Sequence, residues 1–532
     1  MKNERNIVIT GFMGTGKTAV GRIVARHLGR RFVDTDEEIE RRAGRATAEI
    51  FAAEGESAFR KMETALCQEL SEEKGLVIAT GGGALVDPVN RKRMMDSGTV
   101  VCLTATVDEI LCRVNGEQSR PLLPAVDPRA AIGEIFEARA DAYATFPWQI
   151  DTTALSQGEV AARIIALAKC TLFTVHAPGR KYQIHIGSGL LAHLGGALRD
   201  AGISAGGRIA VVSDTNVTPL YWEQAKDALV RAGFDPFPCT IPSGEKHKTL
   251  NTVTSLYEQF LIHRLDRSGT VLSLGGGVSG DIAGFAAATY MRGVGFAQVP
   301  TTLLAMVDAS VGGKTGVDLP QGKNLVGAFH PPQVVVIDPQ LLRTLPREEI
   351  RSGLAEVIKH GIIGDADLFA SLEGRYDLDA WKEGVGSEWV VRALRVKIAV
   401  VEEDPVEQGR RAVLNLGHTL GHALEMLSSY SLRHGEAVSV GMVAAARIAV
   451  KLGQADSTLA RRIVAVLTGW GLPVRCPPFS VDEIWEALSH DKKRHHGSLR
   501  WVIPTAIGAV RIVTDLSPDM VKDVMKRLGA RS

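Results

Sequence analysis

The stretch GFMGTGKT occupies residues 11–18, directly after the apolar segment NIVIT and before the helical pattern KTAVGRIVARHLG. It fits the motif GxxxxGK[ST] in the strand-to-helix setting that this motif requires. Its glycines let backbone N–H groups turn toward phosphate oxygens, and the N-terminus of the following helix adds partial positive charge. Lys17 can reach the β- and γ-phosphates, and the Thr18 hydroxyl can ligate Mg²⁺. The stretch therefore predicts a P-loop that binds a nucleotide.

The sequence around this loop alternates short apolar strands with amphipathic helices. RFVDTD, LVIAT and TVVCLTA have strand patterns, and the helical segment GEVAARIIALAKC ends near Lys169. This rhythm predicts a parallel sheet with helices on both faces, and hence an α/β fold.

The rest of the chain divides into two further regions. TLFTVHA, RIAVVSDTN, TVLSLGGGVSGD and QVVVID continue the α/β rhythm up to about Leu345, after which helical patterns dominate until LRWVIPTAIG. A chain of 532 residues is too long for one compact core. We therefore expect three domains, at residues 1–169, 171–345 and 346–532.

Composition narrows the class of protein. Hydrophobic residues make up 45% and charged residues 23% of the sequence, and the formal net charge is +1 without a long basic run. These values are typical of a globular protein and disfavour nucleic acid as a partner. The six cysteines form no CxxC pair, the N-terminus has no signal-peptide pattern, and no apolar run is long enough to cross a bilayer. We expect a cytoplasmic protein that does not bind membranes.

Several polar residues in the first region are candidates for binding a phosphate acceptor. In FVDTD, Asp34 and Asp36 would point the same way along a strand, one toward Mg²⁺ and the other toward an acceptor hydroxyl. Arg60, the glycines of TGGG, Arg120 and Arg139 follow at intervals. A single arginine is more often a solvated helix residue, so the combination carries the prediction.

Residues 1–169 resemble the shikimate kinase family. The motifs that carry the resemblance together are GFMGTGKT, FVDTD, GESAFRKME, IATGGG, SRPLL and RADAY. The resemblance implies transfer of phosphate from ATP, with Mg²⁺, to the 3-hydroxyl of shikimate. It implies an ATP and Mg²⁺ site at Gly14, Thr15, Gly16, Lys17, Thr18, Ala19, Asp34 and Arg120, and a shikimate site at Asp36, Arg60, Gly82 and Arg139. Lys17 and Arg120 would be catalytic, with Arg120 in a lid. The family tends to have Pro-Leu where this chain has Asp141 and Ala142.

The second region contains a glycine motif of its own. LSLGGGVSGD places Gly275, Gly277 and Gly280 in a literal GxGxxG after a strand, which alone is a weak signal. The usual acid about 20 residues downstream is lacking, and the better candidate is Asp214, upstream at a strand end. A dinucleotide site here would be Rossmann-like but not of the ordinary kind.

Three histidines occur in LNLGHTLGHALEMLSSYSLRHGE. His418 and His422 are four residues apart, and this spacing favours a metal pair on one helix face. A histidine pair on a helix can equally be one metal ligand and one acid/base group. Glu356 is the strongest candidate for a carboxylate ligand, and His360 is a rival ligand. Spacing alone leaves these alternatives open.

Residues 171–532 resemble the 3-dehydroquinate synthase family in a series of long motifs. These are SDTN, PSGEKHK, GGGVSGDIAGFAAATYMRG, QVPTTLLAMVDASVGGKTGVD, GKNLVGAFHPP, GLAEVIKHG and LNLGHTLGHALE with RHGEAVSVGM. The resemblance implies an NAD-binding α/β domain followed by a mostly α-helical metal-binding domain. It implies Zn²⁺, or Co²⁺ in its place, on Glu356, His418 and His434, and it leaves His422 as an acid/base group.

The same resemblance implies two larger sets of residues. The NAD-facing set is Asp214, Asn216, Glu245, Lys248, Gly277, Asp281, Thr301, Thr302, Asp308 and Lys323. The set around the substrate, a heptulosonate phosphate, is Arg292, Lys314, Asn324, Lys359, Lys397, Arg411, Asn415 and His422, of which Lys314, Lys359, Lys397 and His422 would be catalytic. Glu407 would orient one of these cations, and the segment HDKKRHHGSLRW offers Lys492, Lys493 and Arg500 for the phosphate.

The two resemblances together imply a bifunctional enzyme of aromatic amino acid synthesis. The second part would convert 3-deoxy-arabino-heptulosonate 7-phosphate to 3-dehydroquinate and phosphate by a hydride cycle through NAD, and it would form a homodimer. The two reactions are not consecutive, so we expect no direct transfer between the sites. The rival functions are a different sugar-phosphate cyclase or a polyol dehydrogenase for the second part, and a non-catalytic nucleotide sensor for the first.

Overall fold

The protein is described by a computed structural model that covers residues 5–114, 128–382, 386–429, 431–494, 499–514 and 516–531. The chain divides into two compact units. The first contains Met1–Thr171 with Ala192–Ala205 and Ala228–Gly233, and the second contains the remainder. Within the described residues, no helix has both the length and the apolar character that crossing a membrane requires.

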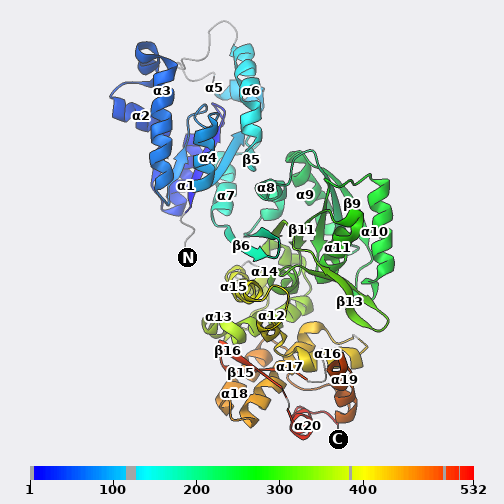
Figure 1. Cartoon of the computed structure of the whole chain (residues 1–532). Coiled ribbons are helices and arrows are strands. Elements are labelled where there is room, and N and C mark those ends of the chain that lie inside the picture. Colours follow the sequence, from blue (N-terminus) through cyan, green and yellow to red (C-terminus); the bar gives the residue numbers. More distant parts are fainter. Residues whose placement is uncertain are drawn as a thin grey trace. The chain divides into compact units, whose positions relative to one another are not determined.

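The first unit contains a parallel sheet of strand order β2-β3-β1-β4-β5, as the alternating pattern predicts (Figure 1). Its strands are β1 (Asn6–Gly11), β2 (Phe32–Asp34), β3 (Val77–Ala79), β4 (Gly98–Thr104) and β5 (Trp148–Asp151). Its helices are α1 (Lys17–Leu28), α2 (Thr35–Ala43), α3 (Thr47–Glu72), α4 (Pro88–Ser97), α5 (Val107–Val114), α6 (Pro128–Ala144) and α7 (Gln157–Ala168).

Local sequence signals set the ends of these helices. Asp87 accepts hydrogen bonds from two backbone N–H groups at the start of α4, and Pro88 occupies the first helical position. Ser156 and Glu159 form a reciprocal capping box at the start of α7. Helix α1 ends at Gly29, whose φ of 63° is readily accessible to glycine. The apolar faces of the helices pack on the buried strands, where Ile7, Val8 and Ile9 have no exposed surface.

The second unit begins with a seven-stranded sheet of order β6-β7-β14-β11-β10-β8-β9, in which the six strands from β7 to β9 are parallel. Its strands are β6 (Thr171–Ala177), β7 (Arg180–Ile186), β8 (Arg208–Asp214), β9 (Asp235–Ile241), β10 (Thr270–Gly275), β11 (Gly295–Pro300) and β14 (Val334–Ile337). Helices α9 (Thr218–Arg231), α10 (Leu250–Ile262) and α11 (Gly277–Thr289) connect them, and β12 (Lys314–Leu319) pairs with β13 (Gly322–Phe329). Helix α8 (Leu194–Asp200), which follows β7 in the sequence, and the last residues of α9 belong to the first unit.

The chain after Leu345 is mostly helical, as the sequence predicts (Figure 1, yellow to red). Its helices are α12 (Arg347–Gly364), α13 (Ala366–Leu372), α14 (Asp379–Lys382), α15 (Ser387–Glu403), α16 (His418–Leu427), α17 (His434–Lys451), α18 (Ser457–Gly469), α19 (Val481–Arg494) and α20 (Pro518–Arg527). A hairpin of β15 (Trp501–Ala506) and β16 (Ala509–Val513) joins them. Most residues of helices α12 and α17 are buried, including the charged Glu356 and Lys359 of α12, and the two helices form the core of this region.

Glycines bring three of these helices unusually close together. A Cβ at Gly441 on α17 would overlap the carbonyl oxygen of Gly417, which precedes α16. A Cβ at Gly435 would overlap the carbonyl oxygen of Ser352 on α12. Because Gly417 and Gly435 are next to His418 and His434, the close approach brings the histidine-bearing helix ends toward α12.

Candidate functional site

The P-loop of the first unit has the geometry that its sequence predicts. It lies between β1 and α1, with Gly14 and Gly16 at φ of 74° and 89°, and α1 begins at Lys17. The Lys17 ammonium donates to the carbonyl oxygen of Phe12 at 2.9 Å. The Thr18 hydroxyl donates to Asp34 Oδ2 at 2.7 Å. The two side chains expected near Mg²⁺, Thr18 and Asp34, therefore contact each other at the helix N-terminus.

The expectation that Asp34 and Asp36 share one face of a strand is wrong. Strand β2 ends at Asp34, and α2 begins at the next residue. Asp34 Oδ1 accepts the backbone N–H of Asp36 at 3.0 Å, so this carboxylate caps the helix. Asp36 lies in the first turn of α2, where it is half-buried and its Oδ1 has no hydrogen-bond partner among the described residues.

The glycine triplet at residues 81–83 brings the remaining acceptor residues together. A Cβ at Gly81 would lie 2.5 Å from Asp36 Oδ1, and one at Gly83 would lie 2.5 Å from Arg60 Nη1. A Cβ at Gly82 would lie 3.3 Å from Arg139 Nη1. All four residues of the predicted shikimate set thus lie around one backbone turn, where a side chain at Gly81 or Gly83 would displace Asp36 or Arg60. Arg120 lies outside the described residues.

Glu63 belongs to this group but was not predicted from the sequence. Its Oε2 accepts a hydrogen bond from Arg60 Nη1 at 2.5 Å, and its side chain is 2% exposed. Burial raises the pKa of Glu63 to about 7, although Arg60 opposes the rise. Burial and the Asp34 carboxylate raise the pKa of Asp36 as well. The sequence signal that could have indicated Glu63 is its position three residues after Arg60 on α3, which places both side chains on one helix face.

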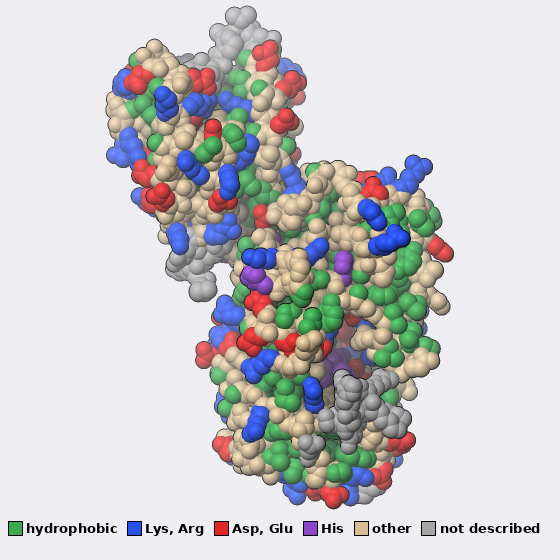
Figure 2. Space-filling model, viewed as in Figure 1, with side chains coloured by type: hydrophobic (Ala, Val, Ile, Leu, Met, Phe, Trp, Pro, Cys, Tyr) green, Lys and Arg blue, Asp and Glu red, His purple; other side chains and the backbone are tan. Residues whose placement is uncertain are grey.

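The second unit contains a cavity of about 1450 Å³ lined by both its α/β region and its helical region. In Figure 2, histidine side chains are visible inside a hollow of this unit. Nine residues of the predicted NAD-facing set line the cavity: Asp214, Asn216, Glu245, Lys248, Gly277, Asp281, Thr301, Thr302 and Lys323. The tenth, Asp308, is not among the described residues that line it.

The glycine-rich turn lies at the carboxyl end of β10, with α11 starting at Gly277. Asp214 ends the neighbouring strand β8 and accepts a hydrogen bond from the Ser279 hydroxyl at 3.2 Å. A Cβ at Gly275 would lie 2.6 Å from Ser279, so this turn has no space for a side chain. Carboxyl ends of parallel strands, a helix N-terminus and a strand-end acid are the parts that a dinucleotide site needs. The residues present fit NAD.

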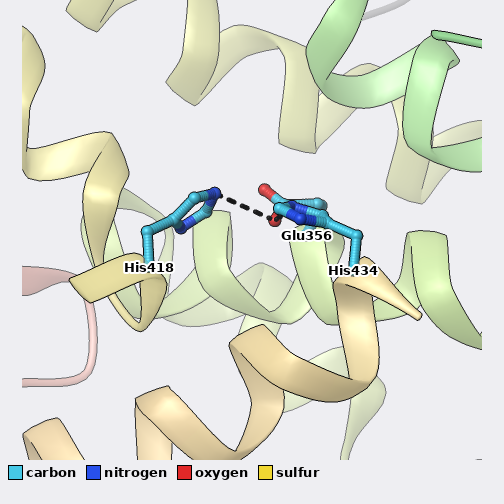
Figure 3. Close-up of side chains that lie close together, drawn as sticks. All are labelled: Glu356, His418 and His434. Carbon is cyan, nitrogen blue, oxygen red and sulfur yellow. Dashed lines mark ion pairs between the residues drawn. The ribbon is translucent and has the colours of Figure 1, made fainter. Parts of the chain in front are cut away.

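Glu356, His418 and His434 converge from α12, α16 and α17, and their side chains point toward one another (Figure 3). Glu356 Oε1 is 3.9 Å from His418 Nε2 and 3.4 Å from His434 Nε2. Glu356 is fully buried; its Oε2 forms an ion pair with Lys359, and its Oε1 accepts no hydrogen bond from a described residue. A buried carboxylate facing two imidazole nitrogens is a donor set that suits Zn²⁺. The residues present fit a metal ion.

The second ring nitrogens of both histidines also have partners. His418 Nδ1 is 3.3 Å from the carbonyl oxygen of Leu416, and His434 Nδ1 is 3.5 Å from Glu425 Oε2. Burial and Lys359 lower the pKa of His418 well below its ordinary value. Burial alone would lower the pKa of His434, but the carboxylates of Glu356 and Glu425 raise it to about 9. Such outer contacts orient the imidazoles that hold a metal.

The spacing argument for His418 and His422 as a metal pair is not supported by the geometry. Both residues lie on α16 with ring centroids 5.3 Å apart, but the ligand atoms that converge are those of Glu356, His418 and His434. His422 lines the cavity beside them. The structure therefore brings together the set that the family resemblance implies.

The rival ligand His360 belongs to a second group, with Asp308 and Glu356. Asp308 lies on a π-helical turn and accepts a hydrogen bond from Lys397 Nζ at 2.7 Å, with Lys359 Nζ at 4.0 Å. These ammonium groups already balance the charge of Asp308. The group with two histidines fits a metal better, because it offers two imidazole nitrogens, which are common Zn²⁺ ligands, whereas the other group offers one.

The predicted substrate set divides between the cavity wall and the protein interior. Lys314, Asn324, Asn415 and His422 line the cavity, and Lys314 forms an ion pair with Glu407. Lys359, Lys397 and Arg411 are buried, and Arg292 is exposed; none of these four is among the described residues that line the cavity. Arg433 and Arg500 line it as well. The cations are therefore arranged in two layers, one on the wall and one behind it.

Comparisons with known proteins match the first part of the chain and the remainder to two different families. The family model of shikimate kinase matches residues 13–169, and the models of the N-terminal and C-terminal parts of 3-dehydroquinate synthase match residues 238–352 and 353–494. The 3-dehydroquinate synthase of Microcystis aeruginosa is 47% identical over 355 residues, which are 66% of this chain and 96% of that protein.

Two solved structures are also similar. ValA, the 2-epi-5-epi-valiolone synthase of Streptomyces hygroscopicus with NAD⁺ and Zn²⁺ bound, is 31% identical with a TM-score of 0.61, covering 65% of this chain and 96% of that one. Shikimate kinase from Acinetobacter baumannii in complex with shikimate is 38% identical with a TM-score of 0.30, covering 31% of this chain and 93% of that one. On its family models and relatives, the chain belongs to the 3-dehydroquinate synthase family and carries a shikimate kinase domain ahead of it.

Proposed function

We propose that the chain is a bifunctional enzyme of the shikimate pathway. Its first part phosphorylates shikimate with ATP and Mg²⁺, and its second part converts 3-deoxy-arabino-heptulosonate 7-phosphate to 3-dehydroquinate and phosphate. We propose the domains 1–169, 171–345 and 346–532 for the kinase, the NAD-binding region and the metal-binding region.

In the kinase part, binding residues surround the place where the γ-phosphate would meet the acceptor. The P-loop backbone from Gly14 to Ala19 and the Lys17 ammonium hold the phosphates, and Thr18 and Asp34 hold Mg²⁺. Arg60 and Arg139 bind the shikimate carboxylate, the pairing for which guanidinium geometry is suited. Asp36 accepts a hydrogen bond from an acceptor hydroxyl, through the oxygen that has no partner among the described residues. We propose Arg120 as a further catalytic cation.

In the synthase part, Glu356, His418 and His434 hold Zn²⁺ or Co²⁺, and the nine cavity-lining residues named above hold NAD. When bound, the metal supplies a Lewis acid for a ring alcohol, and NAD⁺ supplies a reversible hydride acceptor. His422 lies on the cavity wall outside the ligand set, where its imidazole exchanges protons with the substrate. Lys314, Asn324 and Asn415 bind the anionic substrate directly.

The buried cations act from behind the wall. Lys359 pairs with Glu356, and Lys397 pairs with Asp308, so both hold carboxylates in place and add positive potential to a cavity that takes a doubly anionic substrate. We propose that Lys359, Lys397 and Arg411 contribute in this way, and that Asp308 positions the two lysines instead of contacting NAD.

We also propose a homodimer formed through the synthase part, in the cytoplasm, where ATP and NAD are available. Leu261 and Ile262 are 61% and 75% exposed on α10, and Figure 2 shows hydrophobic side chains gathered over that side of the unit. Arg292 is exposed and outside its own cavity. A second copy would cover the apolar surface and is the simplest means of bringing Arg292 to a substrate.

The observation that carries the synthase proposal is the convergence of Glu356, His418 and His434, with His422 beside them, at the cavity that the glycine-rich turn after β10 also lines. The test is a pair of assays on the purified chain: ADP formation that depends on shikimate, and phosphate release from the heptulosonate phosphate with added NAD⁺. We expect both activities without net formation of NADH. Absence of either activity would contradict the corresponding half of the proposal.

A second candidate for the synthase part is a different sugar-phosphate cyclase, because ValA has a similar structure. The higher identity to 3-dehydroquinate synthase favours the heptulosonate phosphate. A seven-carbon sugar phosphate that lacks the carboxylate distinguishes the two candidates. Faster turnover of that compound would favour the second candidate.

A further inference from the structure

Glu425 is a buried carboxylate that the proposed reaction does not use. It lies on α16, three residues after His422, with its side chain 5% exposed. Its two oxygens have different partners: Oε2 is 3.5 Å from His434 Nδ1, and Oε1 accepts a hydrogen bond from Lys323 Nζ at 3.4 Å. Glu425 therefore contacts His434, one of the three proposed metal ligands, and Lys323, one of the residues of the predicted NAD-facing set.

The contacts continue on the NAD side. Lys323 Nζ is also 3.3 Å from Glu245 Oε1, and both residues line the cavity. Glu245 comes from the short turn Glu245–His247, Lys323 from β13 and Glu425 from α16, so three separate elements meet at the Lys323 ammonium. Burial opposes the charge on Lys323, and the two carboxylates compensate for it.

We propose that Glu425 is a positioning residue for the metal centre, which fixes His434 and is itself held by Lys323. His434 directs Nε2 at Glu356 and Nδ1 at Glu425. A carboxylate at Nδ1 favours the tautomer in which Nδ1 carries the proton, so that Nε2 is the nitrogen available to a metal. The inference rests on the proposed metal site and adds a residue outside the ligand set.

The structure also supplies a matched control. Glu245 contacts the same ammonium, whereas His434 Nδ1 faces Glu425, so Glu245→Gln removes one negative charge beside Lys323 and leaves the Glu425–His434 contact in place. Glu425→Gln removes a charge from the same ammonium and weakens the contact with the imidazole. If Glu425 served only to neutralise Lys323, the two variants would affect the metal equally.

The experiment measures Zn²⁺ affinity of the full chain by competition with a chromogenic chelator, and the visible absorption of the Co²⁺-loaded protein. We expect Glu425→Gln to weaken Zn²⁺ binding by about 10–100-fold, the range typical of lost outer-sphere partners, and to shift the Co²⁺ bands at saturating cobalt. Glu245→Gln should leave both readouts close to those of the unsubstituted chain. Near-UV circular dichroism of the metal-free proteins checks that both variants are folded.

Two results would overturn the inference: Zn²⁺ affinity within twofold of the original in Glu425→Gln, or an equal loss in Glu245→Gln. Should Glu425→Gln fail to fold, Glu425→Asp keeps the charge and shortens the reach, and unchanged Zn²⁺ affinity in that variant would be equally contrary. If the unsubstituted chain bound no Zn²⁺, the proposed metal site itself would fail. These outcomes separate the inference from the function on which it rests.

Discussion

The two catalytic parts of this chain are built in opposite ways. The proposed phosphate-binding part of the kinase site is one contiguous eight-residue loop of mainly backbone groups, although the proposed acceptor residues extend from Asp36 to Arg139. The synthase site consists of side chains buried on helices, and its metal group extends over 79 positions, from Glu356 to His434. The phosphate loop is therefore encoded within a short segment, whereas the metal group depends on how distant helices pack.

The sharpest test of this comparison removes one key residue from each part. His434→Ala should lower phosphate release from the heptulosonate phosphate on the order of 10³-fold, because a metal ligand supports several kcal/mol of charge stabilisation. The same variant should retain shikimate-dependent ADP formation. Lys17→Ala should give the reverse result. Loss of both activities in both variants would contradict two independent sites.

Removal of the metal should likewise inactivate the synthase part and spare the kinase part. Incubation with a strong chelator should lower synthase turnover at least about 100-fold, since the Lewis acid is removed. Kinase turnover should recover fully when Mg²⁺ alone is returned. Added Zn²⁺ or Co²⁺ should restore the synthase, and synthase activity that survives verified metal removal would refute a metal-dependent mechanism.

The dependence of the synthase site on helix packing can be tested at Gly441. Gly441→Ala inserts a methyl group against the carbonyl oxygen of Gly417, and overpacking of this kind costs about 1–3 kcal/mol. We expect a lower thermal unfolding temperature and weaker Zn²⁺ retention. The matched control is Gly133→Ala on α6, where a Cβ meets nothing within 4 Å. That change should be neutral or slightly stabilising, and equal effects of the two changes would contradict the packing argument.

The smallest effect that we expect is a pH dependence in the kinase part. Burial raises the pKa of Glu63 from 4.5 to about 7, so Glu63 is mainly protonated below pH 7 and ionised above it. The ionised form competes for Arg60 and repels an incoming carboxylate. The KM for shikimate should therefore rise by up to about tenfold as the pH increases from 6 to 8. Glu63→Gln should flatten this rise, and an unchanged profile in that variant would exclude Glu63 as its source.

The sequence predicted the fold well because its signals are local. Helix caps, glycine turns and the change of pattern after Leu345 all depend on near neighbours, and the structure confirms the parallel sheets and the later helical region. The period-two interpretation of Asp34 and Asp36 failed for a local reason as well. The Asp34 side chain caps α2, which ends the strand before Asp36.

The sites were predicted less evenly. Spacing alone paired His418 with His422, and only the longer family motif indicated His434, because residues 16 positions apart meet through the packing of two helices. The sequence did not indicate that Asp308 and Lys397 also pair with each other, as a buried charge requires a counter-charge. Glu63 and Glu425 were missed because the sequence alone does not distinguish a buried glutamate from a solvated one.

The glycine contacts beside His418 and His434 have a consequence for how the metal is acquired. Backbone-to-backbone packing brings both helix ends to Glu356, so the positions of the three donors depend on the packing of α12, α16 and α17. We therefore expect the donors to stay together when the ion is exchanged. Depletion followed by resupply should thus be a fast, reversible exchange, in which the ion that occupies the donors follows availability.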